Sequence, residues 1–403
     1  MVRPELQFVL LFSIATAVAI ATRRLRLPYT VALVLVGLAL GALPLPSRPT
    51  LSRDLLFAVV LPGLLFEAAV HLRKEWLADT RASIAALAIP GVVLALGITA
   101  GLVLPGVRAL VPTFGMLDAL AFAAATVATD PIAVVATFRE LKAPRRLSVL
   151  VEGESLLNDG TGVVVFNLVV AAAAGAGLSL PAAAGQFALV SIGGALVGGL
   201  LAFAIVQVLK RIDEPMIEVT LTVIAAYGSF AIAEQLEVSG VIATVAAGLV
   251  CGNAARRGTH SDAAIAALRT FWEYVAFALN SIVFLLIGLQ VGMPALLNDW
   301  KPILIGYVVV TVVRFIVVFT TAAALRPTRE RMPWRWTLIV GWSGLRGALA
   351  MVLAIALPGS FPSRELIVHM TFGVVLLSII AQGLTIGPLL RRLGIKEEQS
   401  AEA

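Results

Sequence analysis

The sequence predicts an all-α polytopic membrane protein with about thirteen transmembrane helices. Of its 403 residues, 60% are hydrophobic and 13% are charged, and the mean hydropathy is +0.98. A soluble protein of this composition would lack the polar residues needed to cover its surface. Apolar runs of about 20 residues, the length that crosses the hydrocarbon core of a bilayer, recur along the whole chain.

The expected spans are separated by short loops that leave no room for a soluble domain. They cover residues 5–22, 28–46, 54–71, 83–104, 112–138, 147–174, 182–209, 216–234, 238–254, 264–292, 302–325, 334–356 and 366–390. We expect the first span to be retained and not cleaved as a signal peptide, because Arg23, Arg24 and Arg26 follow it directly.

The basic residues predict how the chain is oriented. When the 30 Lys and Arg residues are sorted by loop, and Arg269 and Arg335 near span ends are counted with the adjoining loops, 22 lie on one side, 6 on the other and 2 deep inside spans. The positive-inside rule then places the N-terminus outside the cell membrane and the C-terminus in the cytoplasm. The net charge of +6 therefore reflects topology and predicts no nucleic-acid partner. Since Cys251 is the only cysteine, disulfides and cysteine metal sites are excluded, and no cofactor is expected.

The number of spans indicates an internal repeat. Six spans precede the one at 182–209 and six follow it, so this odd connector would invert the second half relative to the first. Two inverted six-helix repeats are typical of secondary transporters.

Both halves carry an interrupted span at the same relative position. In the first half, "VATDPIAVV" places Asp130 and Pro131 in an apolar run, and the proline frees the carbonyl of Val127 from its helical donor. In the second half, "GWSGLRGALA" places Arg346 among three glycines that weaken the helix. Broken backbone at membrane depth persists where it lines a cavity or is buried in protein, so the matched breaks predict a binding site.

A hydroxyl and a carboxylate share one face of the next span, in "VEGESLLNDGTGVVVF". Ser155 and Asp159 are four residues apart and therefore lie on the same side of a helix. Such oxygen ligands suit a small hard cation. The adjacent Asn158 and the break at Thr129 and Asp130 can add further oxygens. These five residues, with Glu67 of an earlier span as a sixth candidate, form the predicted cation site, and Asp159 is its centre.

Two arginines lie deep inside expected spans, where a charge needs a partner. Arg314 is about 11 residues from either end of its span, which is about 16 Å of helix rise and too far to reach water. Glu154 is the candidate partner, in a structural ion pair that joins the two halves. Arg346 could compete for this acid, but we expect it at the helix crossing, facing the carbonyl ends of half-helices or Asp130.

Three further acids lie near span ends. Glu67, in "LPGLLFEAAVHL", is about four residues from the end of its span. Two interpretations stay open for it, a residue that lines a cytoplasmic vestibule or one that contacts the cation through a water molecule. Glu234 and Glu237 border a non-cytoplasmic loop and are expected to be structural or to attract cations.

Five motifs follow one another along nearly the whole chain: "ATDP", "GESLLNDG", "AEQLEVSGVIATVAAGLV", "FLLIGLQ" and "GLRGA". This combination resembles the sodium/proton exchangers of the monovalent cation:proton antiporter family. The Asn-Asp pair resembles the electroneutral branch, because the electrogenic branch carries two adjacent aspartates. The short segment after Arg392 resembles prokaryotic forms, since eukaryotic relatives carry long cytoplasmic tails.

The resemblance implies roles for the matching residues. Asp159 would bind the cation and the proton alternately, Ser155 and Thr129 would coordinate the cation, and Glu154 would pair with Arg314. It also implies a homodimer in which a core domain with crossed discontinuous helices moves against a dimerisation domain. The expected divisions are dimerisation helices at 1–82, core at 83–175, connector and further dimerisation helices at 176–299, core at 300–392, and a short cytoplasmic tail at 393–403.

The expected function is secondary active exchange of Na⁺, or another small monovalent cation, for H⁺, and not enzymatic catalysis. One carboxylate that holds either a proton or a cation predicts a 1:1, electroneutral cycle with alternating access. A K⁺/H⁺ or broad monovalent cation/H⁺ antiporter stays open, because these ions share ligand types. A cation channel and a proton-coupled carrier of an organic anion also stay open. A hydrolase using Ser155 would lack a histidine base at mid-span.

Overall fold

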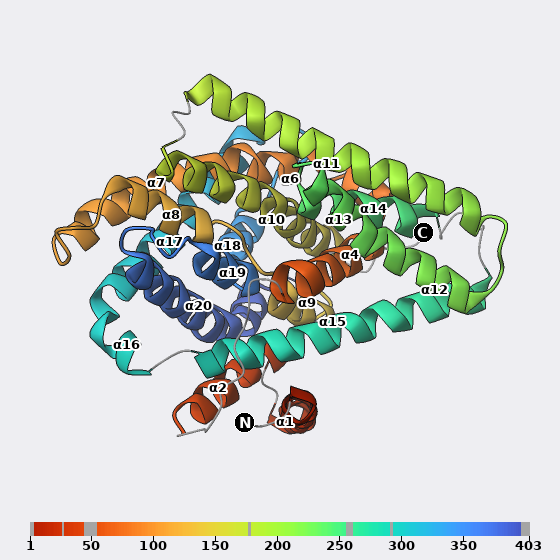
Figure 1. Cartoon of the computed structure of the whole chain (residues 1–403), viewed down its shortest axis with the longest axis horizontal. Helices are drawn as coiled ribbons and strands as arrows, with labels where there is room; N and C mark the ends of the chain where they lie inside the picture. Colours follow the sequence, from red (N-terminus) through yellow and green to blue (C-terminus); the bar gives the residue numbers. More distant parts are fainter. Residues whose placement is uncertain are drawn as a thin grey trace. The chain divides into compact units, whose positions relative to one another are not determined.

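The computed structural model describes residues 4–25, 28–43, 55–175, 179–254, 261–290 and 293–395 (Figure 1). Every regular element in these ranges is a helix, which confirms the all-α prediction. Seven helical segments are long and apolar enough to cross a membrane: Arg81–Arg108, Arg145–Ala173, Pro181–Leu209, Pro215–Gln235, Ala263–Gln290, Trp300–Ala324 and Arg364–Arg392. Five shorter apolar segments add to them: Val9–Thr22, Tyr29–Gly41, Leu56–His71, Met116–Thr126 and Gly240–Ala254. A total of thirteen crossings stays a prediction.

Most helices overlap an expected span, whereas the short helices Lys74–Ala78 and Met293–Asn298 lie between spans and were not predicted. In chain order the helices are α1 (Pro4–Leu25), α2 (Tyr29–Gly41), η1 (Leu56–Val60), α4 (Leu61–His71), α5 (Lys74–Ala78), α6 (Arg81–Ala88), α7 (Pro90–Arg108), α8 (Met116–Thr126), α9 (Ile132–Glu140), α10 (Arg145–Ala173), α11 (Leu180–Leu209), α12 (Pro215–Val223), η2 (Ile224–Gly228), α13 (Ser229–Gln235), α14 (Gly240–Ala254), α15 (Asp262–Gln290), α16 (Met293–Asn298), α17 (Trp300–Ala324), α18 (Trp334–Trp342), α19 (Ala348–Ala356) and α20 (Arg364–Arg392). The π-helical turns η1 and η2 lie inside longer helices and were not predicted.

Both predicted helix breaks are present. Residues 127–131 separate α8 from α9, and residues 343–347 separate α18 from α19. Pro131 stands directly before α9, where its missing N–H costs nothing. In the second break Gly341 is still helical, so the interruption begins later than the first of the three glycines.

The two breaks touch each other. The backbone N–H of Asp130 donates to the carbonyl of Leu345, with a distance of 2.7 Å between N and O. A Cβ atom at Gly347 would overlap the Asp130 carboxylate, so glycine is required for this approach. The chain thus has the crossed discontinuous helices that were expected.

By its internal contacts the chain divides into two compact units. The first unit comprises Met1–Leu51, Asp79–Asn158 and Ser281–Ala403, and the second comprises Ser52–Ala78 and Asp159–Asn280. Two of the four boundaries fall inside continuous helices, one in α10 and one in α15. The division into core and dimerisation domains stays a prediction, and the predicted tail beyond Ile395 lies outside the described residues.

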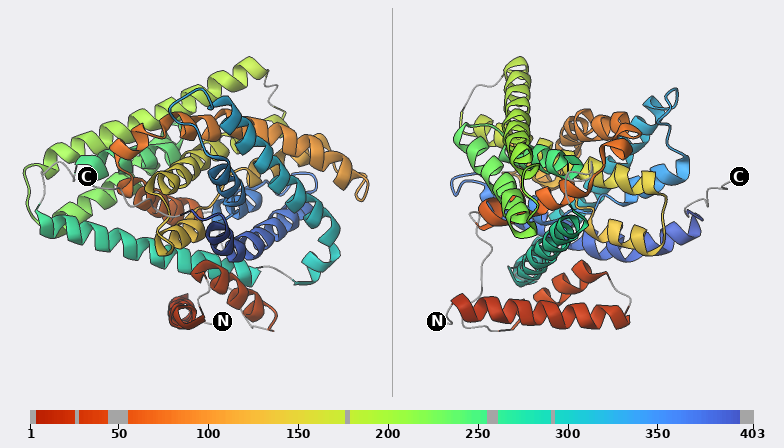
Figure 2. Two further views of the ribbon diagram at one scale, coloured as in Figure 1. Left: turned by 180° about the vertical axis from the view of Figure 1, so that it is seen from behind. Right: turned by 90° about the vertical axis from the view of Figure 1, so that its right-hand side faces the viewer.

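The first unit repeats one arrangement: a long helix, a broken helix and a second long helix. This order is α7, α8–α9 and α10 in the first half, and α17, α18–α19 and α20 in the second. Within this unit α17 packs against α7 and α20. The helices α1 and α2 also lie next to each other, as both views of Figure 2 show. Gly37 of α2 meets Gly288 backbone to backbone, since a Cβ atom at either position would overlap the other helix.

In the second unit α14 packs between α11 and α4 (Figure 1). On one side, Gly198 of α11 lies against the carbonyl of Ala243. On the other side, Gly252 of α14 lies against the backbone of Val70. Small residues let membrane helices approach this closely, because van der Waals packing and not hydrophobic burial holds them together.

Two neighbouring glycines of α11 provide a direct test of this packing. A Cβ atom at Gly198 would overlap the backbone of Ala243, whereas one at Gly199 would meet nothing within 4 Å. We expect Gly198→Ala to destabilise the protein by about 1–3 kcal/mol or more, because overpacking forces the helices apart. Gly199→Ala, the matched control, should be neutral or stabilising by up to about 1 kcal/mol through helix propensity. Melting temperatures in detergent measure both, and equal shifts would contradict this account.

Candidate functional site

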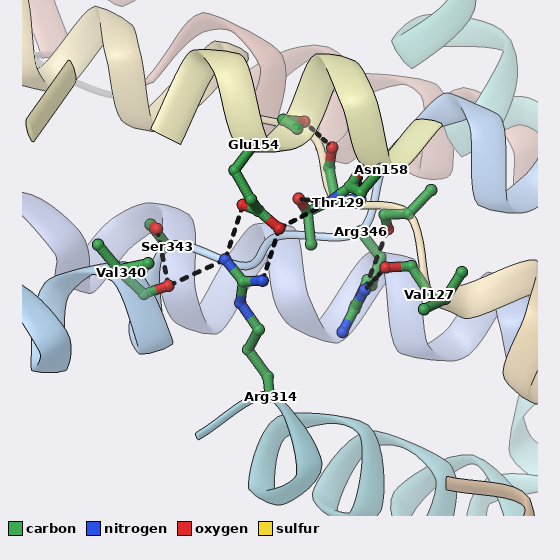
Figure 3. A network of polar contacts seen from close by, with 10 residues as sticks. Val127, Thr129, Glu154, Asn158, Arg314, Val340, Ser343 and Arg346 are labelled. Atoms are coloured by element: carbon green, nitrogen blue, oxygen red, sulfur yellow. Dashed lines mark hydrogen bonds and ion pairs between the residues drawn. The ribbon is translucent and has the colours of Figure 1, made fainter. Parts of the chain in front are cut away.

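Glu154 and Arg314, the partners proposed from the sequence, form a buried ion pair (Figure 3). Arg314 Nη1 donates to Oε1 of Glu154 at 2.7 Å, and Nη2 donates to Oε2 at 2.9 Å. The side chains are 8% exposed for Arg314 and 2% exposed for Glu154. Two parallel hydrogen bonds to one carboxylate make this the strong, bidentate type of pair. Arg314 Nη2 also donates to the carbonyl of Val340 at 3.2 Å, so the pair links α10, α17 and α18.

Asn158 braces the first helix break against α10. Its Nδ2 donates to Oε1 of Glu154 at 2.7 Å and to Oγ1 of Thr129 at 2.8 Å. Its Oδ1 accepts from the backbone N–H of Thr129 at 3.3 Å. Both ends of the amide are therefore used within the protein, and the structure gives Asn158 a positioning role that the sequence did not indicate. Its predicted role as a cation ligand stays a prediction.

Ser155 and Thr129 are also brought together. The Ser155 hydroxyl donates to the backbone carbonyl of Thr129, and both residues are buried. The backbone N–H, the backbone carbonyl and the hydroxyl of Thr129 are therefore all bonded to α10. The predicted contribution of the break to the site has a geometric basis, because its oxygens lie directly against the helix that carries Ser155.

Arg346 binds the carbonyl end of the half-helix α8 (Figure 3). Its Nη1 donates to the carbonyl of Val127 at 2.7 Å and to that of Ala128 at 3.1 Å. Val127 is the residue whose carbonyl Pro131 was expected to free. The negative end of a helix dipole stabilises a cation there. Of the three partners considered from the sequence, the carbonyl ends are the ones Arg346 binds, and Glu154 is bonded to Arg314.

Asp130 lies at the start of the half-helix α9. Its Oδ1 accepts from the backbone N–H of Ile132, the first residue of α9, at 3.0 Å. A carboxylate at a helix N-terminus is stabilised by the helix dipole and by the N–H groups that have no helical acceptor. The crossing therefore places a cation at the C-terminal end of one half-helix and an anion at the N-terminal end of the next.

Asp159 follows Asn158 on the continuous helix α10 and is partly buried. It lies four residues after Ser155, so the two share the helix face that was predicted. The boundary between the two compact units falls directly before it.

Glu67 has a partner that the sequence analysis missed. On α4, His71 Nδ1 lies 3.3 Å from Oε1 of Glu67 and 2.8 Å from its backbone oxygen. The glutamate and the histidine are four residues apart, a spacing that would have indicated this pair. Neither interpretation of Glu67 is decided by this contact.

Two long-range partners could not have been found from the sequence. In the first unit His369 Nδ1 lies 2.7 Å from Oδ2 of Asp299. In the same unit the carboxylate of Glu330 accepts from the backbone N–H groups of Ala82 and Ser83 at 3.1 and 2.8 Å, and so caps the start of α6. No local pattern marks contacts between residues so distant in the chain.

Crossed broken helices with buried charges at their crossing are typical of the secondary transporters, the class of membrane protein to which this chain belongs by its family match. It is therefore not an enzyme. The chain belongs to the sodium/hydrogen exchanger family, since the family model "Sodium/hydrogen exchanger, transmembrane" matches residues 9–392.

Several similar proteins are Na⁺/H⁺ antiporters by name. ApNhaP from Aphanothece halophytica is 36% identical over 402 residues, which are 96% of this chain and 75% of that protein. NhaP from Pseudomonas aeruginosa is 36% identical over 351 residues, which are 84% of this chain and 81% of that protein. Among solved structures, the antiporter MjNhaP1 from Methanocaldococcus jannaschii matches with a TM-score of 0.79 at 19% identity, covering 96% of this chain and 97% of that one. This last likeness supports the fold.

Proposed function

We propose that the protein exchanges one Na⁺ for one H⁺ by letting the two ions compete for Asp159. Exchange of Na⁺ for H⁺ follows from the family and from the relatives that are 36% identical over most of their length. The assignment to Asp159, the 1:1 ratio and the path of the ions are our own proposal.

The observation that carries the assignment is the bidentate ion pair of Glu154. Because both carboxylate oxygens of Glu154 are bonded to Arg314, this acid is committed to structure. Asp159 lies on the neighbouring face of the same helix, one turn after Ser155. We propose that Asp159, Ser155 and Thr129 hold the cation. Asn158 and Asp130 would supply further oxygens to the site, and Glu67 would contact the cation through a water molecule.

The competition follows from the electrostatics of a carboxylate at membrane depth. A bare negative charge is costly to carry through a low-dielectric barrier. Either a proton or a Na⁺ ion removes most of that cost, whereas both together would leave a net positive charge. Only loaded forms of the site then cross, and one ion moves inwards for each that moves outwards.

The remaining features of the proposal come from the sequence. We place the protein in the cell membrane, with its N-terminus outside and its C-terminus in the cytoplasm, on the basis of the 22 to 6 distribution of basic residues. We also propose a homodimer in which a core domain moves against a dimerisation domain.

The 1:1 ratio predicts that transport carries no net charge. In proteoliposomes loaded with Na⁺, an outward Na⁺ gradient should acidify the lumen at the same initial rate with and without a K⁺/valinomycin clamp of the membrane potential. A carrier that moves unequal charges is slowed by the potential it builds up, so a clamp accelerates it. A rate that rises several-fold with the clamp would contradict the 1:1 cycle.

The choice of cation is tested in the same vesicles. Rates measured across Li⁺, Na⁺ and K⁺ gradients separate Na⁺/H⁺ exchange from a broad monovalent cation/H⁺ antiporter. Oxygen ligands alone do not decide between these ions, because cavity size and rigidity set the selectivity. We expect Na⁺ to support the highest rate at equal concentrations.

A further inference from the structure

A small cavity lies within the first unit beside the ion pair. Its volume is about 20 Å³. It is lined mostly by apolar residues of α6, α7, α8 and α17. Six polar side chains also line it: Thr99, Thr126, Glu154, Asn158, Arg314 and Arg346. A cavity of this size has room for one water-sized molecule, which requires about 10–15 Å³.

Two of the lining side chains have buried donors that are not satisfied by the protein. Arg314 and Arg346 are 8% and 5% exposed, and the Nε–H of each has no acceptor among the residues that the structure describes. By contrast, Arg314 Nη1 and Nη2 and Arg346 Nη1 all donate hydrogen bonds within the protein. A buried donor without an acceptor costs about 1–3 kcal/mol, and more when it belongs to a charged group.

We propose that this cavity binds one small hydrogen-bond acceptor, which accepts from the Nε–H groups of both Arg314 and Arg346. Two sources have this chemistry, a water molecule and a chloride-sized anion. The volume suits water. The charges suit an anion, because two guanidinium groups and the single carboxylate of Glu154 line the cavity.

The bound acceptor would connect two parts of the site that share no direct hydrogen bond in the described structure. On one side is the Glu154–Arg314 pair between α10 and α17. On the other is Arg346, which binds the carbonyl end of α8. An acceptor between two like charges also reduces their mutual repulsion. This inference does not rest on the identity of the transported ions.

Cryo-EM density in the cavity and the dependence of the melting temperature on the salt used both test the proposal. A cryo-EM map that resolves buried waters should show a peak within hydrogen-bonding distance of both Nε atoms, and a map without this peak overturns the proposal. Melting temperatures in sodium chloride and sodium gluconate at equal ionic strength show whether the acceptor is a water molecule or an anion. A melting temperature that is higher in chloride, with a difference that disappears in Arg346→Lys, assigns an anion. Equal values in the two salts, with the peak present, assign water.

A cavity-filling variant gives a second test that needs no map. Ala123 lines the cavity and is 2% exposed, so Ala123→Val places two additional methyl groups there. Displacement of a bound acceptor should lower the melting temperature by several degrees, and the loss should be smaller in an Arg346→Lys background, which lacks one of the two donors. Filling a dry cavity stabilises a protein, so a higher melting temperature in Ala123→Val would overturn the proposal. An equal loss in both backgrounds would indicate overpacking and would also overturn it.

Discussion

Asp159→Asn is expected to abolish Na⁺-driven proton movement in proteoliposomes while the protein stays folded. Asparagine keeps the size of the side chain but has no charge to exchange between a proton and a cation. The amide can neither release a proton nor neutralise a Na⁺ ion. We expect initial rates to fall to those of vesicles without protein. The melting temperature should change little, because Asp159 is only partly buried.

The matched control is the same substitution at an exposed acid. Asp213 lies in the loop between α11 and α12 and is exposed. Asp213→Asn removes one negative charge without touching the proposed site, so it should exchange at the rate of the unaltered protein. Full exchange by purified Asp159→Asn would mean that another acid carries the ions, and Asp130 would be the next to examine.

Breaking the Glu154–Arg314 pair should have the largest effect on stability. Removing one partner of a buried pair leaves an uncompensated charge and typically costs about 3–5 kcal/mol. Glu154→Gln also weakens the acceptor that Asn158 uses, so the brace at Thr129 should loosen with it. We expect a lower melting temperature and poor recovery after purification for both Glu154→Gln and Arg314→Met.

The double variant distinguishes a structural pair from residues on the ion path. With both charges removed no buried charge is left unpaired, so Glu154→Gln with Arg314→Met should be more stable than either single variant. Arg314→Lys keeps the charge but cannot form the two parallel bonds, and it should be intermediate. Single variants that melt at the original temperature yet do not transport would show that the pair takes part in ion movement.

Local chemistry explains which features could be predicted from the sequence. Pro131 disrupts a helix wherever it stands, so the first break and the free carbonyl of Val127 could be predicted. The position of Arg314 in the middle of a span required an acid within the protein, and Glu154, inside another expected span, was the candidate. The second break was located only approximately, because glycine weakens a helix without stopping it, and Gly341 remained helical.

Other contacts depend on side-chain direction, which a single sequence does not reveal. The amide of Asn158 could have faced the ion or its neighbours, and the structure bonds it to Glu154 and Thr129. Arg346 had three possible partners, and only the fold shows that it binds the carbonyls at the end of α8. The pair of Glu67 and His71 is different, since a spacing of four residues on one helix is a local signal that a sequence does contain.

The helix crossing has a consequence for leakage. Broken helices usually leave backbone groups that water must satisfy, and a file of water molecules conducts protons. Here Arg346 occupies the carbonyls of Val127 and Ala128, and the N–H of Asp130 is bonded to Leu345. These backbone groups of the two breaks are therefore bonded within the protein and do not need water as a partner. We therefore expect this region to act as an electrical insulator, so that the stored gradient is not dissipated while the carrier waits for its next ion.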